Sequence, residues 1–225
     1  MPFPLKPGKA GKLVFITGPP GSGKSTIAGT LAKTKNWVYY EGDGFLFGFN
    51  PYVSPDESQV EARSKRPALI GPGMAAREMA LKAWFENQQM LINNQTTDSY
   101  PSDYFYRLMA LDIVVERARV GGDWVVSCGV LADRRERDIF RGVVGDQQVV
   151  FVVLDISVEL VKERLAGREE SEDAVEGLVA VHFQYKPPES NEPRTVGFEI
   201  LDGTTKEENT QRIVELINKE CANAN

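Results

Sequence analysis

Cysteine is scarce in this chain: two of the 225 residues are cysteines, Cys128 and Cys221, and they lie far apart. Neither forms a CxxC pair or a spacing typical of metal ligands, so the sequence indicates neither a disulfide framework nor a structural zinc site. We therefore expect both to be buried or unreactive thiols of a protein in a reducing compartment. The single histidine, His182, stands between Val181 and Phe183 and is expected to pack rather than to catalyse.

An excess of positive charge and a long apolar run are also missing. Lys and Arg total 26 against 32 Asp and Glu, which gives a net charge of -6 and a pI near 5.1. General binding to nucleic acid or to an anionic membrane requires a net positive face, so both partners are excluded, although a local basic pocket for a small anion is compatible. Because neither a membrane span nor a signal sequence is recognisable, we expect a soluble, cytoplasmic protein.

Short apolar runs alternate with longer helical patterns, which is the signature of βαβ units and a parallel sheet. Most of these runs are continuously apolar, as expected for strands that are covered by helices on both faces. The strands are predicted at 13–17, 37–40, 124–127, 149–154 and 195–200, and the helices at 24–34, 75–93, 103–120, 134–141, 158–168 and 206–221. Ser157 is the expected N-cap of the fifth helix, and Thr204 or Thr205 that of the last.

The chain is predicted to be a single domain, residues 1–225, with an insertion. Residues 41–122 separate two predicted strands by more chain than a crossover needs, so they are expected to form an inserted acceptor-binding subdomain. A second departure is REESEDAVEG, residues 168–177, which is acidic and is expected to be mobile.

The clearest motif is GPPGSGKST, which directly follows the predicted strand LVFIT and opens a helix. It matches G-x-x-x-x-G-K-[ST], in which backbone N–H groups and the positive end of the helix surround phosphate oxygens. A plain turn would explain the glycines but not the adjacent lysine and hydroxyl. Lys24 is therefore expected to contact the β- and γ-phosphates of ATP, and Ser25 to bind Mg²⁺. The residues predicted to bind the nucleotide in this loop are Gly18, Pro19, Pro20, Gly21, Ser22, Gly23, Lys24, Ser25 and Thr26.

The remaining motifs narrow the class of P-loop protein. The NKxD and DxxG motifs of switch GTPases are missing, and the third strand ends at Cys128 rather than at the acid typical of motor ATPases. Asp155 ends the fourth strand and could be such an acid, but an acid at a strand end is explained equally well by capping of the next helix. Small-molecule and nucleotide kinases fit the size of the chain and its large insertion.

Four segments carry a resemblance to the gluconokinase family and its relatives, the shikimate kinases. EGDGFLF resembles the D-G-D-x-L-H segment of gluconokinases, and CGVLADRRERDIFR is similar to their C-S-A-L-K-R-x-Y-R-D-x-L-R. LDISVELVKERLAGR and LVAVHFQYKPPESNEP resemble later segments of the family. Three features depart from the family pattern: the histidine after D-G-D is absent, the lid sequence is replaced by REESED, and residues 60–100 are longer than the family needs.

The resemblance implies an α/β, three-layer P-loop NTPase fold with a five-stranded parallel sheet, like nucleoside-monophosphate kinases, and a lid at about residues 164–190. It implies that Arg164 and Arg168 close over the phosphates during transfer, where Glu163, Glu169 and Glu170 offer ordinary surface pairing instead.

Three further residues are candidates for the site. Asp43 lies just beyond the end of a strand, where it could orient the acceptor hydroxyl and take its proton, or be a solvated turn acid. Glu41 could hold a Mg²⁺-bound water. Arg134 could stack on adenine or belong to a solvated helix face. Arg134, Arg135 and Arg137 stand at the start of a predicted helix. Cations there oppose the helix dipole, so a nearby anion is expected for these three arginines.

The predicted function is ATP- and Mg²⁺-dependent phosphoryl transfer to a hydroxyl of a small metabolite, with gluconate or a similar sugar acid preferred. A nucleoside or nucleotide kinase is the alternative within enzymes, and a non-catalytic ATP-binding regulatory protein is the alternative from another class. The partner is then a small-molecule acceptor, and the protein a monomer or homodimer.

Overall fold

A computed structural model of the protein describes residues 11–47, 82, 86, 103–145, 149–166, 172–183 and 185–222. These residues contain one sheet of five parallel strands in the order β2-β3-β1-β4-β5. The strands are β1 (Leu13–Thr17), β2 (Val38–Glu41), β3 (Trp124–Cys128), β4 (Val149–Asp155) and β5 (Thr195–Glu199), each within one residue of the predicted bounds. In the centre of the sheet, Leu13 of β1 pairs with Trp124 on one side and with Val149 on the other.

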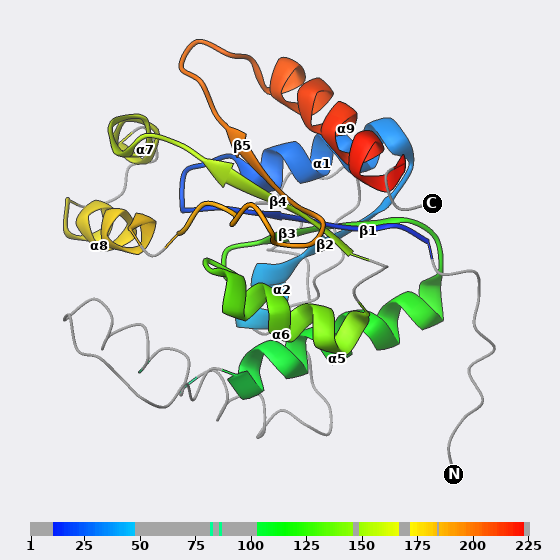
Figure 1. The fold of residues 1–225 in the computed structure, drawn as a ribbon. Coiled ribbons are helices and arrows are strands. Elements are labelled where there is room, and N and C mark those ends of the chain that lie inside the picture. The colour runs from blue at the N-terminus through cyan, green and yellow to red at the C-terminus, as the bar shows by residue number, and fades with distance from the viewer. Residues whose placement is uncertain are drawn as a thin grey trace.

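Helices cover both faces of this sheet (Figure 1). One layer is built on α1 (Lys24–Lys35) and α9 (Lys206–Ala222), with α7 (Val158–Ala166) and α8 (Glu172–His182) packed at its edge. The other layer contains α2 (Gly42–Phe47), α5 (Asp103–Val120) and α6 (Arg134–Val144). The predicted three-layer α/β architecture is therefore confirmed.

The alternation of side chains along β1 explains why its sequence is continuously apolar. Val14 and Ile16 belong to the core under α1 and α9, whereas Leu13 and Phe15 belong to the core under α5 and α6. All four are at most 1% exposed, since each face of the strand is covered by a helical layer. On the second face, the ring of Phe15 lies 5.2 Å from that of Phe140 in α6.

Side chains cap the helices as two of the sequence patterns predict. The hydroxyl of Ser157 accepts a hydrogen bond from the backbone N–H of Leu160 at the start of α7. At the start of α9, Thr205 rather than Thr204 is the cap: its hydroxyl accepts from the N–H of Glu208, while the carboxylate of Glu208 accepts from the N–H of Thr205.

Two helices were not predicted. The EGDG stretch, interpreted as turn chemistry, instead begins α2 at Gly42, where a Cβ atom would lie 2.7 Å from the carbonyl oxygen of Ser127. The second is α8, most of which falls in the acidic stretch expected to be mobile. Val175 and Leu178 of this helix pack against the core.

The middle of the predicted subdomain lies outside the described residues, except for Lys82 and Glu86, which are helical as the predicted helix at 75–93 requires. Within the described part of the chain, every helix is too short or too polar to cross a bilayer.

Candidate active site

The loop between β1 and α1 has the backbone geometry of a phosphate cradle. Gly21 and Gly23 have φ angles of 79° and 89°, a left-handed conformation that glycine adopts without strain. Gly23 occupies the N-cap position of the 12-residue helix α1, and no side chain among the described residues caps this helix end. The backbone N–H groups of the first turn of α1 therefore have no side-chain acceptor from the cap, and they lie where the helix dipole favours an anion.

Two polar side chains complete the loop. The ammonium group of Lys24 donates to the carbonyl oxygen of Pro19 at 2.9 Å, so this side chain folds back across the loop. The hydroxyl of Ser22 is buried and has no hydrogen-bond partner among the described residues. A buried hydroxyl without a partner carries an unfavourable free energy that an oxygen of a bound ligand would relieve.

Ser25 lies in a buried polar cluster at the carboxyl ends of β2 and β3. Its hydroxyl is 3.0 Å from that of Ser127, and Ser127 is the register partner of Glu41. The hydroxyl of Tyr39 donates to the carboxylate of Glu41 at 2.6 Å and lies 3.5 Å from the carbonyl oxygen of Ser25. The two predicted Mg²⁺ residues, Ser25 and Glu41, are thus brought to the same cluster, and Glu41 is 2% exposed.

This cluster offers oxygen ligands that suit a hard cation. Mg²⁺ typically binds one or two protein oxygens and completes its shell with water and substrate phosphate, so a hydroxyl and a carboxylate are an adequate set. Among the described residues, no group of three or more His, Cys, Asp or Glu is placed to form a metal cage by itself.

Arg164, predicted to be a lid residue, reaches the loop from α7. Its guanidinium donates to the carbonyl oxygen of Gly21 at 3.2 Å, across 143 positions of sequence. The second predicted lid residue, Arg168, lies outside the described residues. Asp43 has its backbone in the first turn of α2, directly after the end of β2, and its side chain also lies outside the described part of the structure.

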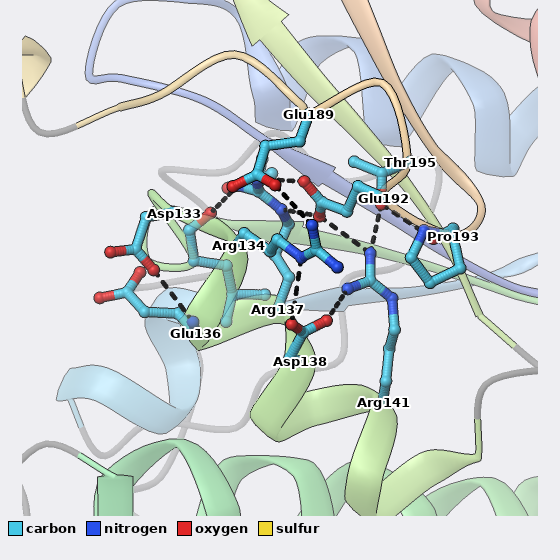
Figure 2. Close-up of polar contacts among 12 residues, drawn as sticks. Asp133, Arg134, Glu136, Arg137, Asp138, Arg141, Glu189, Glu192, Pro193 and Thr195 are labelled. Atoms are coloured by element: carbon cyan, nitrogen blue, oxygen red, sulfur yellow. Dashed lines mark hydrogen bonds and ion pairs between the residues drawn. The ribbon is translucent and has the colours of Figure 1, made fainter.

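The arginines at the start of α6 find their anions within the protein. Arg134 donates to Glu189 at 2.5 Å and to the amide oxygen of Asn191 at 2.7 Å, and Arg135 donates to Asp103 at 2.6 Å (Figure 2 shows Arg134 and Glu189). These partners lie far away in the sequence, which is why the expected anion could not be identified from the neighbouring acids alone. The proposed contact of Arg134 with adenine stays a prediction.

A buried ion triad fixes the segment that leads into β5 against α6 (Figure 2). The carboxylate of Glu192 accepts two hydrogen bonds from Arg137, at 2.6 and 2.9 Å, and one from Arg141 at 2.9 Å. The guanidinium carbon of Arg141 lies 4.9 Å from the centre of the Phe151 ring. Burial alone would raise the pKa of Glu192, but hydrogen bonds from Arg137 and Arg141 lower the pKa to about 2.

The same segment is also tied to the turn after β3, and this turn is tied to the phosphate loop. The hydroxyl of Tyr185 donates to the carbonyl oxygen of Gly129 at 2.5 Å, and the N–H of Lys186 donates to that of Ala132 at 2.9 Å. Thr17, the last residue of β1, donates its hydroxyl to the carbonyl oxygen of Val130 at 2.8 Å. The turn at 129–132 is therefore held from both sides.

Glu136, in the first turn of α6, is a second perturbed acid. Burial raises the pKa of its carboxyl to about 7, with a further contribution from the charge of Asp133. Its hydrogen bonds with the hydroxyl of Tyr106 and the N–H of Ala132 only partly offset this. Because Tyr106 belongs to α5, this carboxyl joins α5 to α6.

Beside these ion pairs lies a hollow of about 870 Å³ between α6, the first turns of α5 and residues 186–189. It is lined by charged side chains of both signs. The cations are Arg107, Arg134, Arg135 and Lys186, and the acids are Asp133, Asp138 and Glu189. Cavities of this size hold small organic ligands.

The fold and the loop geometry define a P-loop nucleotide-binding protein. The family model described as AAA domain, AAA_33, matches residues 13–186, and the chain belongs to this family. No curated protein matches the chain.

Several solved structures share the fold. A gluconokinase from Sinorhizobium meliloti 1021 is 20% identical, with 95% of each chain covered and a TM-score of 0.57. A sugar kinase from Janibacter sp. HTCC2649 is 21% identical, over 94% of this chain and 97% of that one, with a TM-score of 0.56. The APS kinase CysC of Mycobacterium tuberculosis, solved with AMPPNP and APS, is 19% identical over 94% and 99% of the chains, with a TM-score of 0.53. The predicted likeness to gluconokinases is confirmed at the level of the fold.

Some residues of the site were missed by the sequence reasoning. Ser127 and Tyr39 were predicted only as parts of strands. A serine near the end of an apolar strand that neighbours the P-loop strand could have indicated a polar residue at the site. Glu192 was quoted within the family-like segment without a role, because its partners lie 51 and 55 positions away.

Proposed function

We propose that this protein is a small-molecule kinase that transfers the γ-phosphoryl group of ATP to a hydroxyl of a small metabolite, with a sugar acid such as gluconate preferred. The observation that carries the proposal is the contact of Ser25, which follows Lys24 in the phosphate loop, with Ser127 and Tyr39 beside Glu41, at the ends of β2 and β3. Open α/β sheets bind their ligands at this edge.

In the proposed reaction, the acceptor oxygen forms a bond to the γ-phosphorus while the bond from that phosphorus to the β,γ-bridging oxygen breaks, and ADP leaves. Asp43 orients the acceptor hydroxyl and takes its proton. Lys24 and the loop N–H groups hold the phosphate oxygens. Mg²⁺ held near Ser25 and Glu41 would supply positive charge to the β- and γ-phosphate oxygens.

Arg164 is proposed to neutralise charge that develops on the transferred group. Its contact with Gly21 places a guanidinium at the loop from a different helical element, as a closing lid requires. Arg168, one turn further along the sequence, is proposed to act with it.

The test is a transfer assay with radiolabelled ATP and a panel of acceptors: gluconate, shikimate, nucleosides, AMP and APS. Label on gluconate or another hydroxy acid supports the proposal. Label on AMP, APS or a nucleoside alone would replace the sugar acid by a nucleotide acceptor, an alternative favoured by the similar fold of the APS kinase. Tight ATP binding without transfer to any acceptor would contradict catalysis.

A further inference from the structure

In the hollow beside α6, the acidic side chains and two of the four cations are engaged with other groups of the protein. Its three acidic side chains are all engaged: Asp133 accepts from the N–H of Glu136 as the N-cap of α6, Glu189 accepts from Arg134, and Asp138 pairs with Arg134 and Arg141. Two of its cations, Arg134 and Arg135, are engaged in turn with acids of the protein.

The two other cations in the hollow are differently placed. Arg107 projects from the second turn of α5, and Lys186 from the segment that follows α8. Within the described part of the chain, neither side chain makes an ion pair or a hydrogen bond. Among the described residues, the hollow therefore presents two positive charges without an acidic partner, from two separate elements. Two of its three acids are paired with arginines, and the third, Asp133, caps α6.

We infer that this hollow binds the anionic group of the acceptor, with Arg107 and Lys186 as residues that determine specificity for an acidic substrate. The inference rests on the proposed function. Carboxylates are bound most strongly by charge-assisted hydrogen bonds from arginine and lysine, and here the two cations reach the same space from different sides.

The position of the hollow agrees with this assignment. Asp133 lines the hollow and comes three residues after Val130. The carbonyl oxygen of Val130 accepts a hydrogen bond from Thr17, which directly precedes the phosphate loop. Three residues of chain span at most about 10 Å, so an extended hydroxy acid could place its carboxylate in the hollow and its far hydroxyl near the loop.

The supporting wall of the hollow is held by hydrogen bonds and buried ion pairs. Lys186 has its backbone bonded to Ala132, and the chain beyond it is held by the buried contacts of Glu192 with Arg137 and Arg141. A binding group that is held in place loses less entropy when the ligand binds, which favours selection of one acceptor over others.

Binding is tested by calorimetry on the full-length protein saturated with AMPPNP and Mg²⁺. The probes are D-gluconate and D-glucitol, which share a six-carbon polyol chain and differ by the carboxylate. The wild type is expected to bind gluconate more tightly than glucitol. Lys186→Ala and Arg107→Ala are each expected to weaken gluconate binding about tenfold, because each removes one charged hydrogen bond. Lys186→Arg should retain most of the affinity.

The matched control is Lys219→Ala, an exposed lysine on α9 in the opposite helical layer, which should bind gluconate like the wild type. Circular dichroism verifies that each variant is folded. For any acceptor that the transfer assay identifies, the Lys186 and Arg107 variants are expected to raise the acceptor KM and to leave the ATP KM unchanged.

The outcomes separate this inference from the proposed function. If the wild type phosphorylates an anionic acceptor while both alanine variants keep its KM, the inference is wrong and the function stands. Transfer to uncharged acceptors alone, or no binding of gluconate and no acidic acceptor in the panel, also overturns the inference. If gluconate binds with the expected variant effects but receives no phosphate, the binding site stands and the proposed reaction fails.

Discussion

Replacing Glu192 by glutamine is expected to destabilise the protein strongly. The carboxylate is the shared acceptor of Arg137 and Arg141, and the side chains of all three are between 0% and 3% exposed. The substitution keeps the size of the side chain but removes the acidic partner of the buried Arg137 and leaves Arg141 with only the half-exposed Asp138. Breaking a buried ion pair on one side typically costs about 3–5 kcal/mol, and the lowered pKa of Glu192, about 2 against 4.5, gives about 3 kcal/mol.

The assay is urea unfolding followed by circular dichroism, at pH 7 and then at lower pH. At pH 7 we expect the free energy of unfolding to fall by about 3 kcal/mol, with a decrease in Tm of about 10 °C. Because the folded pKa of Glu192 lies below its unfolded value, its contribution is present above about pH 4.5 and is lost as the pH falls toward 2. The difference between wild type and variant should therefore shrink in acid.

Glu189→Gln is the matched control, since Glu189 lies on the same segment and also pairs with an arginine of α6. Its side chain is 59% exposed, and surface pairs of this kind contribute less than about 1 kcal/mol. If Glu192→Gln changed the free energy of unfolding no more than Glu189→Gln does, the argument that the triad holds this segment would be refuted.

Three other perturbations follow from the site. Because the pKa of Glu136 is raised to about 7, stability should fall as the pH rises from about 4.5 to 7, by about 3 kcal/mol, and Glu136→Gln should remove this slope in pH-dependent urea unfolding. Ser25→Ala should raise the Mg²⁺ concentration needed for half-maximal transfer by about tenfold, without changing Mg²⁺-free ATP binding. Arg164→Ala should lower kcat about a thousandfold in the transfer assay. A wild-type Mg²⁺ requirement in Ser25→Ala, or a wild-type kcat in Arg164→Ala, would exclude the role assigned to that residue.

Much of the fold could be predicted because the apolar runs in the sequence are the segments that become buried strands. The three central strands, β1, β3 and β4, are buried along nearly their whole length because helices cover both faces of the sheet. The end of β1 is marked by the glycines and lysine of the loop. Helices α2 and α8 were not predicted, because their local sequences do not favour helices. Gly42 and the acidic residues before Val175 favour turns or disorder locally, whereas in the fold Gly42 lies close against the carbonyl oxygen of Ser127, and Val175 and Leu178 pack against the core.

Individual candidates such as Glu41 and Arg164 could be named from the sequence, but which residues lie together was predictable only where they are adjacent in sequence. The phosphate loop is such a segment, whereas the cluster of Ser25, Glu41 and Ser127 joins residues of three elements and depends on the parallel register of β2 and β3. The same holds for Glu192, whose role depends on how the chain returns to the sheet after α8. Sequence spacing does not specify such contacts, because they are set by tertiary packing.

The most direct test of the central claim compares Lys24→Ala with the wild type and with Lys35→Ala, an exposed lysine at the other end of α1. ATP affinity and transfer of the labelled γ-phosphoryl group are measured on each protein. The account predicts that Lys24→Ala lowers transfer by about a hundredfold or more, while Lys35→Ala behaves like the wild type. Unchanged ATP affinity and turnover in Lys24→Ala would contradict it.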